Sequence, residues 1–543
     1  MNLDLLIKGG LIFDGYGLEP YEADIGISGD KIAFINKKSK IRSQQFNHSY
    51  TSFKKEGRRG FDRVIEAEGL SVAPGFIDTH AHSEFTLLAD PRAEGKICQG
   101  ITTEINGNCG LSAAPLYGEA LEQRETDLAE LGIEERWSTF KEYYEILKKG
   151  ISLNFVTLAG HGNIRACITG YKDKTLTLSE IKKMKGLLRK AISEGAVGIS
   201  TGLIYPPGIY STTEELTEIA KCCNKLIFAS HMRSEGDELL ESIKEIIRIG
   251  READIKVHIS HIKTSGKKNW YKIDDAVLLI EKAREKGIEI TCDRYPYNAS
   301  STDLDTMLPS WAYEGGAEEE LKKLKNLDCQ KTMKKEILNE YYRKGYWESI
   351  NIASVSSKKN RWMEGKSIAY IASRKTSKPI DILFQILIEE KLRASAIFSV
   401  MKEDNLRRFL SLPYIMIGTD SSARCDSGPT HKGKPHPRGY GSFPRFLGKH
   451  IREERIMSMG KAIQKITMLP ARTFSIKKRG AIKKGYFADI VVFDQGKIID
   501  RATYNEPFLK PKGIYYVIIN GLPAVWEGRL TGVNAGKILR HGR

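Results

Sequence analysis

The sequence predicts an α/β protein built around a (β/α)8 TIM-like barrel, with a small β-sandwich domain made from both chain ends. Two observations lead to this fold class. Apolar, β-branched runs alternate with helix-like stretches through the middle of the chain, which is the rhythm of parallel βαβ units. Both ends instead carry short alternating runs, which at the N-terminus are separated by Gly-Gly, Asp-Gly and Gly-Asp turns, so we expect antiparallel strands there.

The length of the chain indicates more than one domain. A barrel takes about 250 residues, and up to about 400 with insertions, whereas this chain has 543. We expect the barrel at 71–475, with the sandwich built from 1–70 and 476–543. An insert at about 303–400 separates the seventh and eighth barrel strands and contains a Glu- and Lys-rich stretch at 318–345 that predicts one long helix. Whether the insert covers the active site or adds only bulk stays open at this point.

Eight strands and the helices between them can be placed by pattern. Apolar residues at i, i+3 and i+4 predict helices at 179–194, 214–224, 237–253 and 273–286. Apolar and β-branched runs predict strands at 76–82, 101–110, 153–162, 196–201, 226–232, 256–263, 288–297 and 414–420. In a barrel of this kind the active site lies at the carboxyl ends of the strands.

Histidines gather at those strand ends. His80 and His82 are two positions apart in the first strand, so their rings leave on the same face, and two neutral imidazoles can hold one divalent metal. His231 ends the fifth strand and His261 the sixth, so four of the eleven histidines lie at predicted strand ends. With Cys109 at the end of the second strand, they form a residue set that suits zinc, and we expect a catalytic metal site.

Asp420 ends the eighth strand and is the expected acid/base. A bound zinc lowers the pKa of water to about 7 and polarises a carbonyl. A carboxylate beside it can take a proton from that water and later deliver it to a leaving amine, which contributes roughly 10²–10⁴-fold to the rate. The combination predicts a metal-dependent hydrolase.

The formal charge of +17 comes partly from nine basic residues between 37 and 63. Such a segment is either a basic arm for nucleic acid or anionic lipid, or a solvated loop. We favour the loop because no aromatic-interleaved basic motif or nucleic-acid module accompanies the segment. The residues are Lys37, Lys38, Lys40, Arg42, Lys54, Lys55, Arg58, Arg59 and Arg63.

The spacing of the cysteines and the N-terminal residues of the chain indicate the cellular compartment. The eight cysteines form no CxxC pair, which argues against a thiolate zinc knuckle or a redox motif. The first residues show no charged region followed by a long apolar one, and no run of 18 apolar residues occurs. We therefore expect a cytoplasmic protein with free thiols and no membrane span.

Several longer motifs carry a resemblance to a known family. They are GFIDTHAH, GITTEINGNCG, GAVGISTGLIYPPG, ASHMRSEGD, ISHIKTSG, YPYNASST, IGTDSS and HPRGYGSFPRFLG. With these motifs the chain resembles, nearly end to end, the N-acyl-D-amino-acid deacylases (D-aminoacylases) of the amidohydrolase superfamily. The His-x-His pair is shared across the superfamily, whereas the runs at 107–110 and 436–445 are far more specific.

The resemblance implies zinc-dependent hydrolysis of the amide bond of N-acyl-D-amino acids to a D-amino acid and a carboxylate. It implies that Cys109, His231 and His261 hold a tightly bound zinc. His80 and His82 match the pair that holds a second, weaker metal position beside it.

Further positions follow from the same resemblance. Asp420 matches the catalytic acid/base. The groups that bind the substrate carboxylate correspond to Lys263, Tyr295 and Arg438, and a further substrate contact corresponds to Ser301. One departure from the wider superfamily is informative. Relatives such as hydantoinases bridge two metals with a carboxylated lysine on the fourth strand. In this chain that strand and its continuation, at 196–208, contain no lysine. Cys109, on the second strand, takes the place of the carboxylated lysine, as in the deacylases.

Two other functions stay open. The protein could hydrolyse a cyclic amide or a dipeptide with a D-residue, although a carboxylate-binding site argues against hydantoins. It could also be a catalytically silent scaffold, since a barrel can lose its ligands and keep its fold, but the ligand set here is complete. The expected partner is a small-molecule N-acyl-D-amino acid, with no nucleic acid and no membrane. The sequence leaves open the oligomeric state, the acyl group and the preferred side chain.

Overall fold

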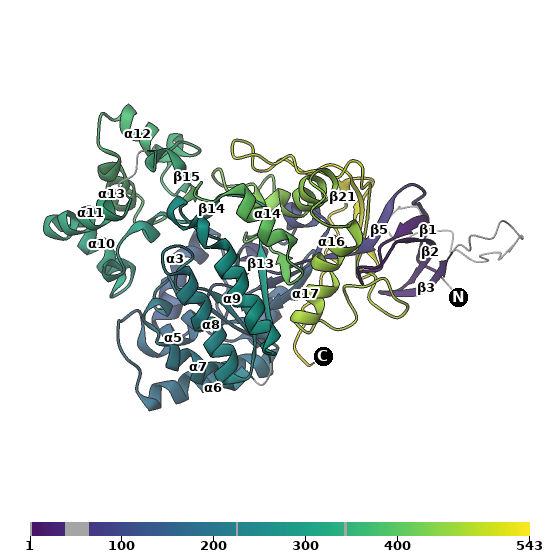
Figure 1. The fold of residues 1–543 in the computed structure, drawn as a ribbon, viewed down its shortest axis with the longest axis horizontal. Coiled ribbons are helices and arrows are strands. Elements are labelled where there is room, and N and C mark those ends of the chain that lie inside the picture. The colour runs from purple at the N-terminus through teal and green to yellow at the C-terminus, as the bar shows by residue number, and fades with distance from the viewer. Residues whose placement is uncertain (1–2, 38–63, 224–225, 342–344, 543) are drawn as a thin grey trace, which may run out of the picture.

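The computed structural model describes residues 3–37, 64–223, 226–341 and 345–542. Of the nine basic residues between 37 and 63, only Lys37 is among them, so the prediction for that segment lies outside the described residues. Figure 1 shows the purple N-terminal strands at one end of the molecule and the green insert helices at the opposite end. Parallel strands with flanking helices lie between these two ends.

Parallel strands form the centre of the molecule. Their bounds are β6 (Phe76–Asp78), β7 (Ile101–Asn106), β8 (Asn154–Thr157), β9 (Ala159–Gly160), β10 (Gly198–Gly202), β11 (Ile227–His231), β12 (Lys256–Ile259), β13 (Ile290–Arg294) and β17 (Ile415–Ile417). Within the described residues they make one sheet of order β17-β13-β12-β11-β10-β9 and another of order β6-β7-β8. These strands coincide with the eight predicted segments, of which the third is divided into β8 and β9, so the α/β prediction is confirmed.

The two parallel sheets meet on both sides. β8 and β9 are separated by one residue, so the chain passes directly from one sheet to the other. On the other side Ala81 and Ser421 form a parallel bridge, and the N–H of Asp420 donates to the carbonyl of His80 at 2.8 Å. The ends of β6 and β17 are therefore held side by side.

The four predicted helices are present as α6 (Leu178–Glu194), α7 (Thr213–Ala220), α8 (Leu239–Ala253) and α9 (Ile273–Glu285). α6 begins with a capping box, in which the side chains of Thr177 and Glu180 each accept from the other's backbone N–H. α8 buries Ile243, Ile246 and Ile249, which follow one another at three-residue spacing and form its apolar face. α7, α8 and α9 pack side by side along one flank (Figure 1).

Further helices complete the central part. They are α1 (Thr86–Ala89), α2 (Glu94–Ile97), α3 (Glu119–Glu130), α4 (Phe140–Leu147), α5 (His161–Thr169), α14 (Glu403–Ser411), α15 (Arg438–Arg445), α16 (Met459–Ile466) and α17 (Met468–Thr473). α15 runs directly into a π-helix, η8 (Phe446–Glu453).

Both chain ends join in one sheet. Its strands are β1 (Leu5–Ile12), β2 (Tyr21–Ser28), β3 (Lys31–Lys37), β4 (Val64–Glu66), β5 (Ser71–Pro74), β18 (Ile490–Phe493), β19 (Ile514–Ile519), β20 (Leu522–Trp526) and β21 (Arg529–Leu530). Their order is β21-β20-β19-β18-β5-β1-β2-β3, with β4 paired to β1. The ends meet where β5 and β18 pair antiparallel. Antiparallel strands are thus present at both ends, while β1 also pairs in parallel with β4 and β5.

The segment between β13 and β17 has its own sheet and its own core. Its strands are β14 (Ser300–Asp303), β15 (Ile350–Val355) and β16 (Ala394–Phe398), and its helices are α10 (Ala317–Lys325), α11 (Leu327–Tyr341), α12 (Ile368–Arg374) and α13 (Pro379–Glu389). The strands pair antiparallel in the order β14-β16-β15. A separate apolar cluster includes Leu304, Leu324, Ile352 and Leu383.

The prediction of one long helix over 318–345 is wrong, because Asn326 divides it into α10 and α11. The backbone of Asn326 is extended, with ψ of 125°. Its side-chain oxygen accepts from the N–H of Cys329 at 3.0 Å, so the same residue that ends α10 caps the start of α11.

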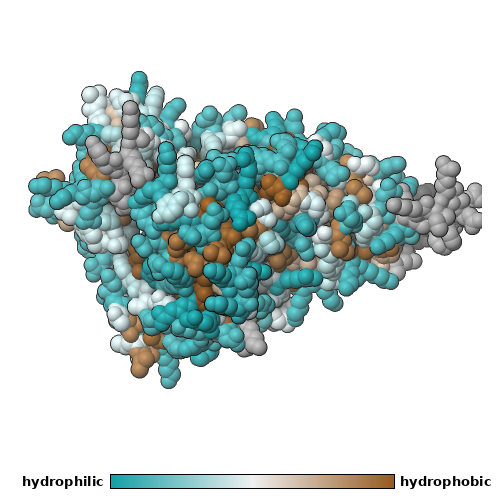
Figure 2. Space-filling model, in the orientation of Figure 1, coloured by the Kyte–Doolittle hydropathy of each residue, from teal (hydrophilic) through white to brown (hydrophobic). Residues whose placement is uncertain are grey.

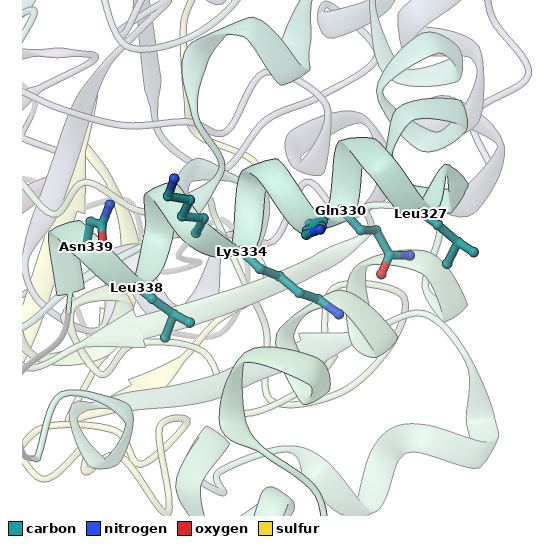
Figure 3. A pocket seen from close by; sticks show the side chains of 7 residues that line it. Leu327, Gln330, Lys334, Leu338 and Asn339 are labelled. Atoms are coloured by element: carbon teal, nitrogen blue, oxygen red, sulfur yellow. The ribbon is translucent and has the colours of Figure 1, made fainter.

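α11 carries a groove with three lysines and the 80% exposed Leu327, but with no acid, thiol or histidine (Figure 3). Its lining residues are Leu327, Gln330, Lys331, Lys334, Lys335, Leu338 and Asn339.

No helix among the described residues is long and apolar enough to cross a bilayer. The face of the molecule shown in Figure 2 is mainly hydrophilic.

Candidate metal centre

The predicted metal and acid/base residues lie together at the carboxyl ends of the central strands. They are His80 and His82 after β6, Cys109 after β7, His231 at the end of β11, His261 after β12 and Asp420 after β17. Segments far apart in the chain thus bring their ligand-type side chains to one place.

The thiol of Cys109 lies at the centre of this group. Its Sγ is 3.3 Å, 3.6 Å and 3.5 Å from ring nitrogens of His80, His231 and His261, respectively. In a tetrahedral zinc site with a Zn–S bond of about 2.3 Å and a Zn–N bond of about 2.0 Å, sulfur and nitrogen ligands lie about 3.5 Å apart. The donor types and the distances from the sulfur to the nitrogens therefore fit zinc, and His80, Cys109 and His261 bring their ligand atoms within 4.8 Å of one another.

Two glycines permit the turn that presents Cys109. Gly107 and Gly110 have φ of 76° and 74°, and Cys109 itself has a φ of 53°. A Cβ on Gly107 would lie 2.1 Å from the carbonyl oxygen of Leu158, so no larger residue fits there. The side chain of Asn108 donates to the carbonyl of Ile105 at 2.9 Å and ties the turn to β7.

Charges within the cluster favour the thiolate. Burial would raise the pKa of Cys109, but the charge of His80 and hydrogen bonds with His231 and His261 hold this pKa well below its usual value. Burial would lower the pKa of His80, but Asp293 and Cys109 raise it well above the usual value. The thiolate is the form of cysteine that binds metals.

Asp420 lies beside the cluster, between a histidine and an arginine. Its carboxylate is 3.3 Å from Nε2 of His82 and 2.8 Å from a guanidinium nitrogen of Arg438. Burial would raise the pKa of Asp420, but the Arg438 charge and the hydrogen bond with His82 hold it well below its usual value. Asp420 is therefore a carboxylate at neutral pH, which is the form that accepts a proton.

Two of the predicted substrate-binding residues, Arg438 and Lys263, lie near the ring of a third, Tyr295. The guanidinium carbon of Arg438 is 4.6 Å and Lys263 Nζ is 5.9 Å from the ring centre. The buried hydroxyl of Tyr295 has no hydrogen-bond partner among the described residues. Arg438 also donates to the carbonyl of Ser301 at 3.1 Å, and its own N–H donates to Nδ1 of His436 at 3.0 Å. All four predicted residues are thus near Asp420 or near one another.

Two carboxylates behind the histidines escape sequence reasoning. Asp293 lies 3.3 Å from Nδ1 of His80 and 2.8 Å from Nε2 of His258. Glu235 lies 2.8 Å from Nδ1 of His261 and forms an ion pair with Lys263. Their only signals in the sequence are the position of Asp293 at the end of a strand and that of Glu235 four residues after a predicted ligand.

A second group of potential ligands lies away from this site. Glu403, His450 and Glu454 bring ligand atoms within 4.8 Å of one another. Lys449 forms an ion pair with Glu403, and Arg407 lies 3.2 Å from Glu454. Their carboxylates already have cationic partners, and none of the predicted site residues belongs to the group.

Comparison with known proteins finds relatives that match nearly the whole chain. A sequence profile of the amidohydrolase family matches residues 63–219 and 361–525. D-aminoacylase of Alcaligenes xylosoxydans xylosoxydans is 33% identical over 539 residues, which is 99% of this chain and 97% of that protein. N-acyl-D-glutamate deacylase of the same organism is 32% identical and covers the same shares.

A solved structure is similarly close. N-acyl-D-glutamate deacylase from Bordetella bronchiseptica, complexed with zinc and a phosphonate mimic of the tetrahedral intermediate, aligns with a TM-score of 0.80 at 31% identity. The alignment covers 99% of this chain and 100% of that one. With such similarity over nearly its whole length, the chain belongs to the D-aminoacylase (N-acyl-D-amino-acid deacylase) family of amidohydrolases.

Proposed function

We propose that this protein hydrolyses the amide bond of N-acyl-D-amino acids in a zinc-dependent reaction, giving a D-amino acid and a carboxylate. The observation that carries the proposal is a buried cysteine thiol with three imidazoles within 3.6 Å, beside a carboxylate held by an arginine. The family relatives named above include deacylases of N-acyl-D-glutamate and a structure with zinc.

Cys109, His231 and His261 would hold the tightly bound zinc, and His80 and His82 a second, weaker position. The first assignment is supported by the distances of 3.6 Å and 3.5 Å from Cys109 Sγ to His231 and His261. The second is supported by His80 and His82, which lie 3.7 Å and 3.3 Å from the carboxylate of Asp420. A bound zinc would lower the pKa of water to about 7 and polarise the carbonyl of the amide.

Asp420 acts as the acid/base. As a carboxylate it takes a proton from the attacking water while the C–O bond forms at the acyl carbon. It then delivers that proton to the amide nitrogen while the C–N bond breaks, so that an amine leaves. The ion pair with Arg438 and the contact with His82 fix its orientation.

Arg438, Lys263 and Tyr295 bind the carboxylate of the substrate, with Ser301 as a further contact. Arginine offers a planar fork to a carboxylate, lysine offers a point charge, and the unpartnered hydroxyl of Tyr295 is available as a donor. Three contacts on one carboxylate, together with the reacting amide, fix the orientation at the α-carbon and thereby select one enantiomer.

The same proposal extends to the finer architecture. The contacts between β8 and β9 and between β6 and β17 support closure of the two parallel sheets into one (β/α)8 barrel over 71–475, with an insert at about 303–400. The single sheet shared by both ends and the apolar cluster that both ends contribute support a separate β unit of 1–70 and 476–543, which we propose folds as the β-sandwich. All eight cysteines are free, which suits a cytoplasmic location.

Metal content and chiral product analysis on a panel of N-acetyl-D- and L-amino acids would test the function. We expect one or two zinc ions per chain and release of D-amino acids only. Zinc without turnover on any N-acyl amino acid would move the substrate to another amide, such as a cyclic amide or a dipeptide with a D-residue. Absence of both metal and turnover would leave a silent scaffold.

A further inference from the structure

The three imidazoles around Cys109 present different nitrogens to its sulfur. His80 and His261 face it with Nε2, whereas His231 faces it with Nδ1. The nitrogen that binds a metal must carry a lone pair, so the proton must sit on the other ring nitrogen. A hydrogen-bond acceptor behind each ring fixes that choice.

Glu235 provides this acceptor for His261 and lies near His231. One carboxylate oxygen of Glu235 is 2.8 Å from Nδ1 of His261. The other is 3.9 Å from Nε2 of His231, a buried nitrogen with no hydrogen-bond partner among the described residues. A single carboxylate therefore lies behind two of the predicted zinc ligands, while Asp293 lies behind His80.

Lys263 competes for the same nitrogen of His261. Its Nζ lies 2.9 Å from Nδ1 of His261 and also pairs with Glu235. Nδ1 of a neutral imidazole can donate to the carboxylate or accept from the ammonium, but it cannot do both. If Nδ1 accepts from Lys263, the ring proton moves to Nε2, which faces Cys109 and then has no lone pair for a metal.

We propose that Glu235 is a positioning residue that holds His261 in its metal-binding tautomer. It accepts the Nδ1–H of His261 and keeps the ammonium of Lys263 as its own ion-pair partner, so that the ammonium does not donate to the ring. The same carboxylate thereby connects a metal ligand with a residue that binds the substrate carboxylate. The inference rests on the metal site proposed above.

The first test measures the zinc dissociation constant of Glu235→Ala by competition with a chelator at one fixed pH. Loss of the outer partner of a metal-binding histidine should weaken zinc binding about 10–100-fold. Glu235→Gln, which keeps the shape and an acceptor for Nδ1–H but lacks the charge that holds Lys263, should lose less. If the alanine variant does not fold, the glutamine variant still gives a measurable loss.

The second test is a rescue that a merely structural role would not produce. In Glu235→Ala/Lys263→Met no ammonium competes for Nδ1 of His261. The double variant should therefore bind zinc more tightly than Glu235→Ala alone. The ligand-field absorption of bound Co²⁺ provides an independent readout, since the double variant should regain the wild-type bands that the single variant loses.

Two controls complete the design. Asp237→Asn removes a carboxylate two residues further along the same loop, which pairs with Lys268 and Asn269, and should leave the zinc affinity unchanged. Lys263→Met alone should not weaken zinc binding, because Glu235 still holds the ring.

Each outcome has a distinct meaning. A double variant that binds zinc no better than Glu235→Ala would contradict the proposal that Glu235 and Lys263 compete for Nδ1 of His261. Wild-type affinity in both Glu235 variants would overturn the positioning role itself. If the wild-type protein binds no zinc, the proposed zinc-dependent function is wrong. This result is distinguishable from the other two, because both of them require zinc binding by the wild-type protein.

Discussion

The described part of the chain contains two clusters of potential metal ligands, which differ in what surrounds them. Both bring three ligand atoms within 4.8 Å of one another. In the central cluster the buried thiol of Cys109 meets imidazole nitrogens, and the carboxylates of Asp293 and Glu235 lie behind the rings. In the second cluster the ligand atoms include the carboxylates of Glu403 and Glu454, and each already has a cationic partner.

Proximity of ligand-type residues therefore does not by itself define a metal site. Outer groups that orient the donors strengthen a metal site, and Asp293 and Glu235 lie in this position behind the central imidazoles. Lys449 and Arg407 already neutralise the second cluster. We therefore expect substitutions in the central cluster to change zinc binding or turnover, and a substitution in the second cluster to change neither.

Cys109→Ala should have the largest effect. It removes the atom that three imidazoles surround, so zinc affinity should fall by more than the roughly 100-fold that loss of an outer partner can cost. Turnover should be lost with the metal. Chelator competition and metal analysis provide the measurement, and Cys329→Ala, in the insert, is the matched control. Retention of full zinc affinity would remove Cys109 from the ligand set.

Asp420→Asn should separate chemistry from metal binding. The amide cannot accept a proton from water, so kcat should fall about 10²–10⁴-fold while zinc remains bound. Asp426→Asn, six residues further along the chain and paired with Lys510, is the control and should keep its activity. An Asp420→Asn protein that binds zinc and keeps full turnover would disprove the acid/base role.

Arg438→Lys should act mainly on substrate binding. It keeps a positive charge near Asp420 but loses the fork that contacts a carboxylate in two places. Loss of one charge-assisted hydrogen bond, about 1.5–3 kcal/mol, predicts a KM about 10–100-fold higher for N-acyl-D-amino acids. The comparison substrate is the corresponding N-acyl amine without a carboxylate. An equal loss on both substrates would argue against a carboxylate contact.

Glu454→Gln should have the smallest effect. It lies in the second cluster, where Arg407 and His450 contact its partly exposed carboxylate. The free energy of unfolding should change by less than about 1 kcal/mol, and the zinc content per chain should stay the same. A lower zinc content in this variant would show that ion pairing does not exclude a metal there.

Much of the fold and the positions of the histidines could be predicted because both depend on local pattern. The strands before His80, Cys109 and Asp420 contain apolar and β-branched residues, and a parallel sheet brings their carboxyl ends to one edge. The break at Asn326 escaped prediction because helix propensity on both sides favours one helix, while a single cap divides it.

The carboxylates around the cluster could not be predicted, because their partners come from other strands. Glu235 lies in a loop and resembles any exposed acid until the fold brings it to His261. His258 and His261 are three positions apart, so strand alternation places them on opposite faces, yet the carboxylate of Asp293 contacts the ring of His258 and accepts from the backbone N–H of His261. The positive φ of 34° at His261, beyond the end of β12, breaks that alternation.

The sheet shared by the two chain ends has a consequence for synthesis. The strands β5 and β18 pair, although roughly 400 residues separate them in the chain. At about 5–20 residues per second, a ribosome needs roughly 20–80 s to make that stretch. During this time the edge of β5 that later receives β18 is without its partner, and unpaired edges invite aggregation. The nascent protein therefore depends on protection of its N-terminal strands until the last part of the chain emerges.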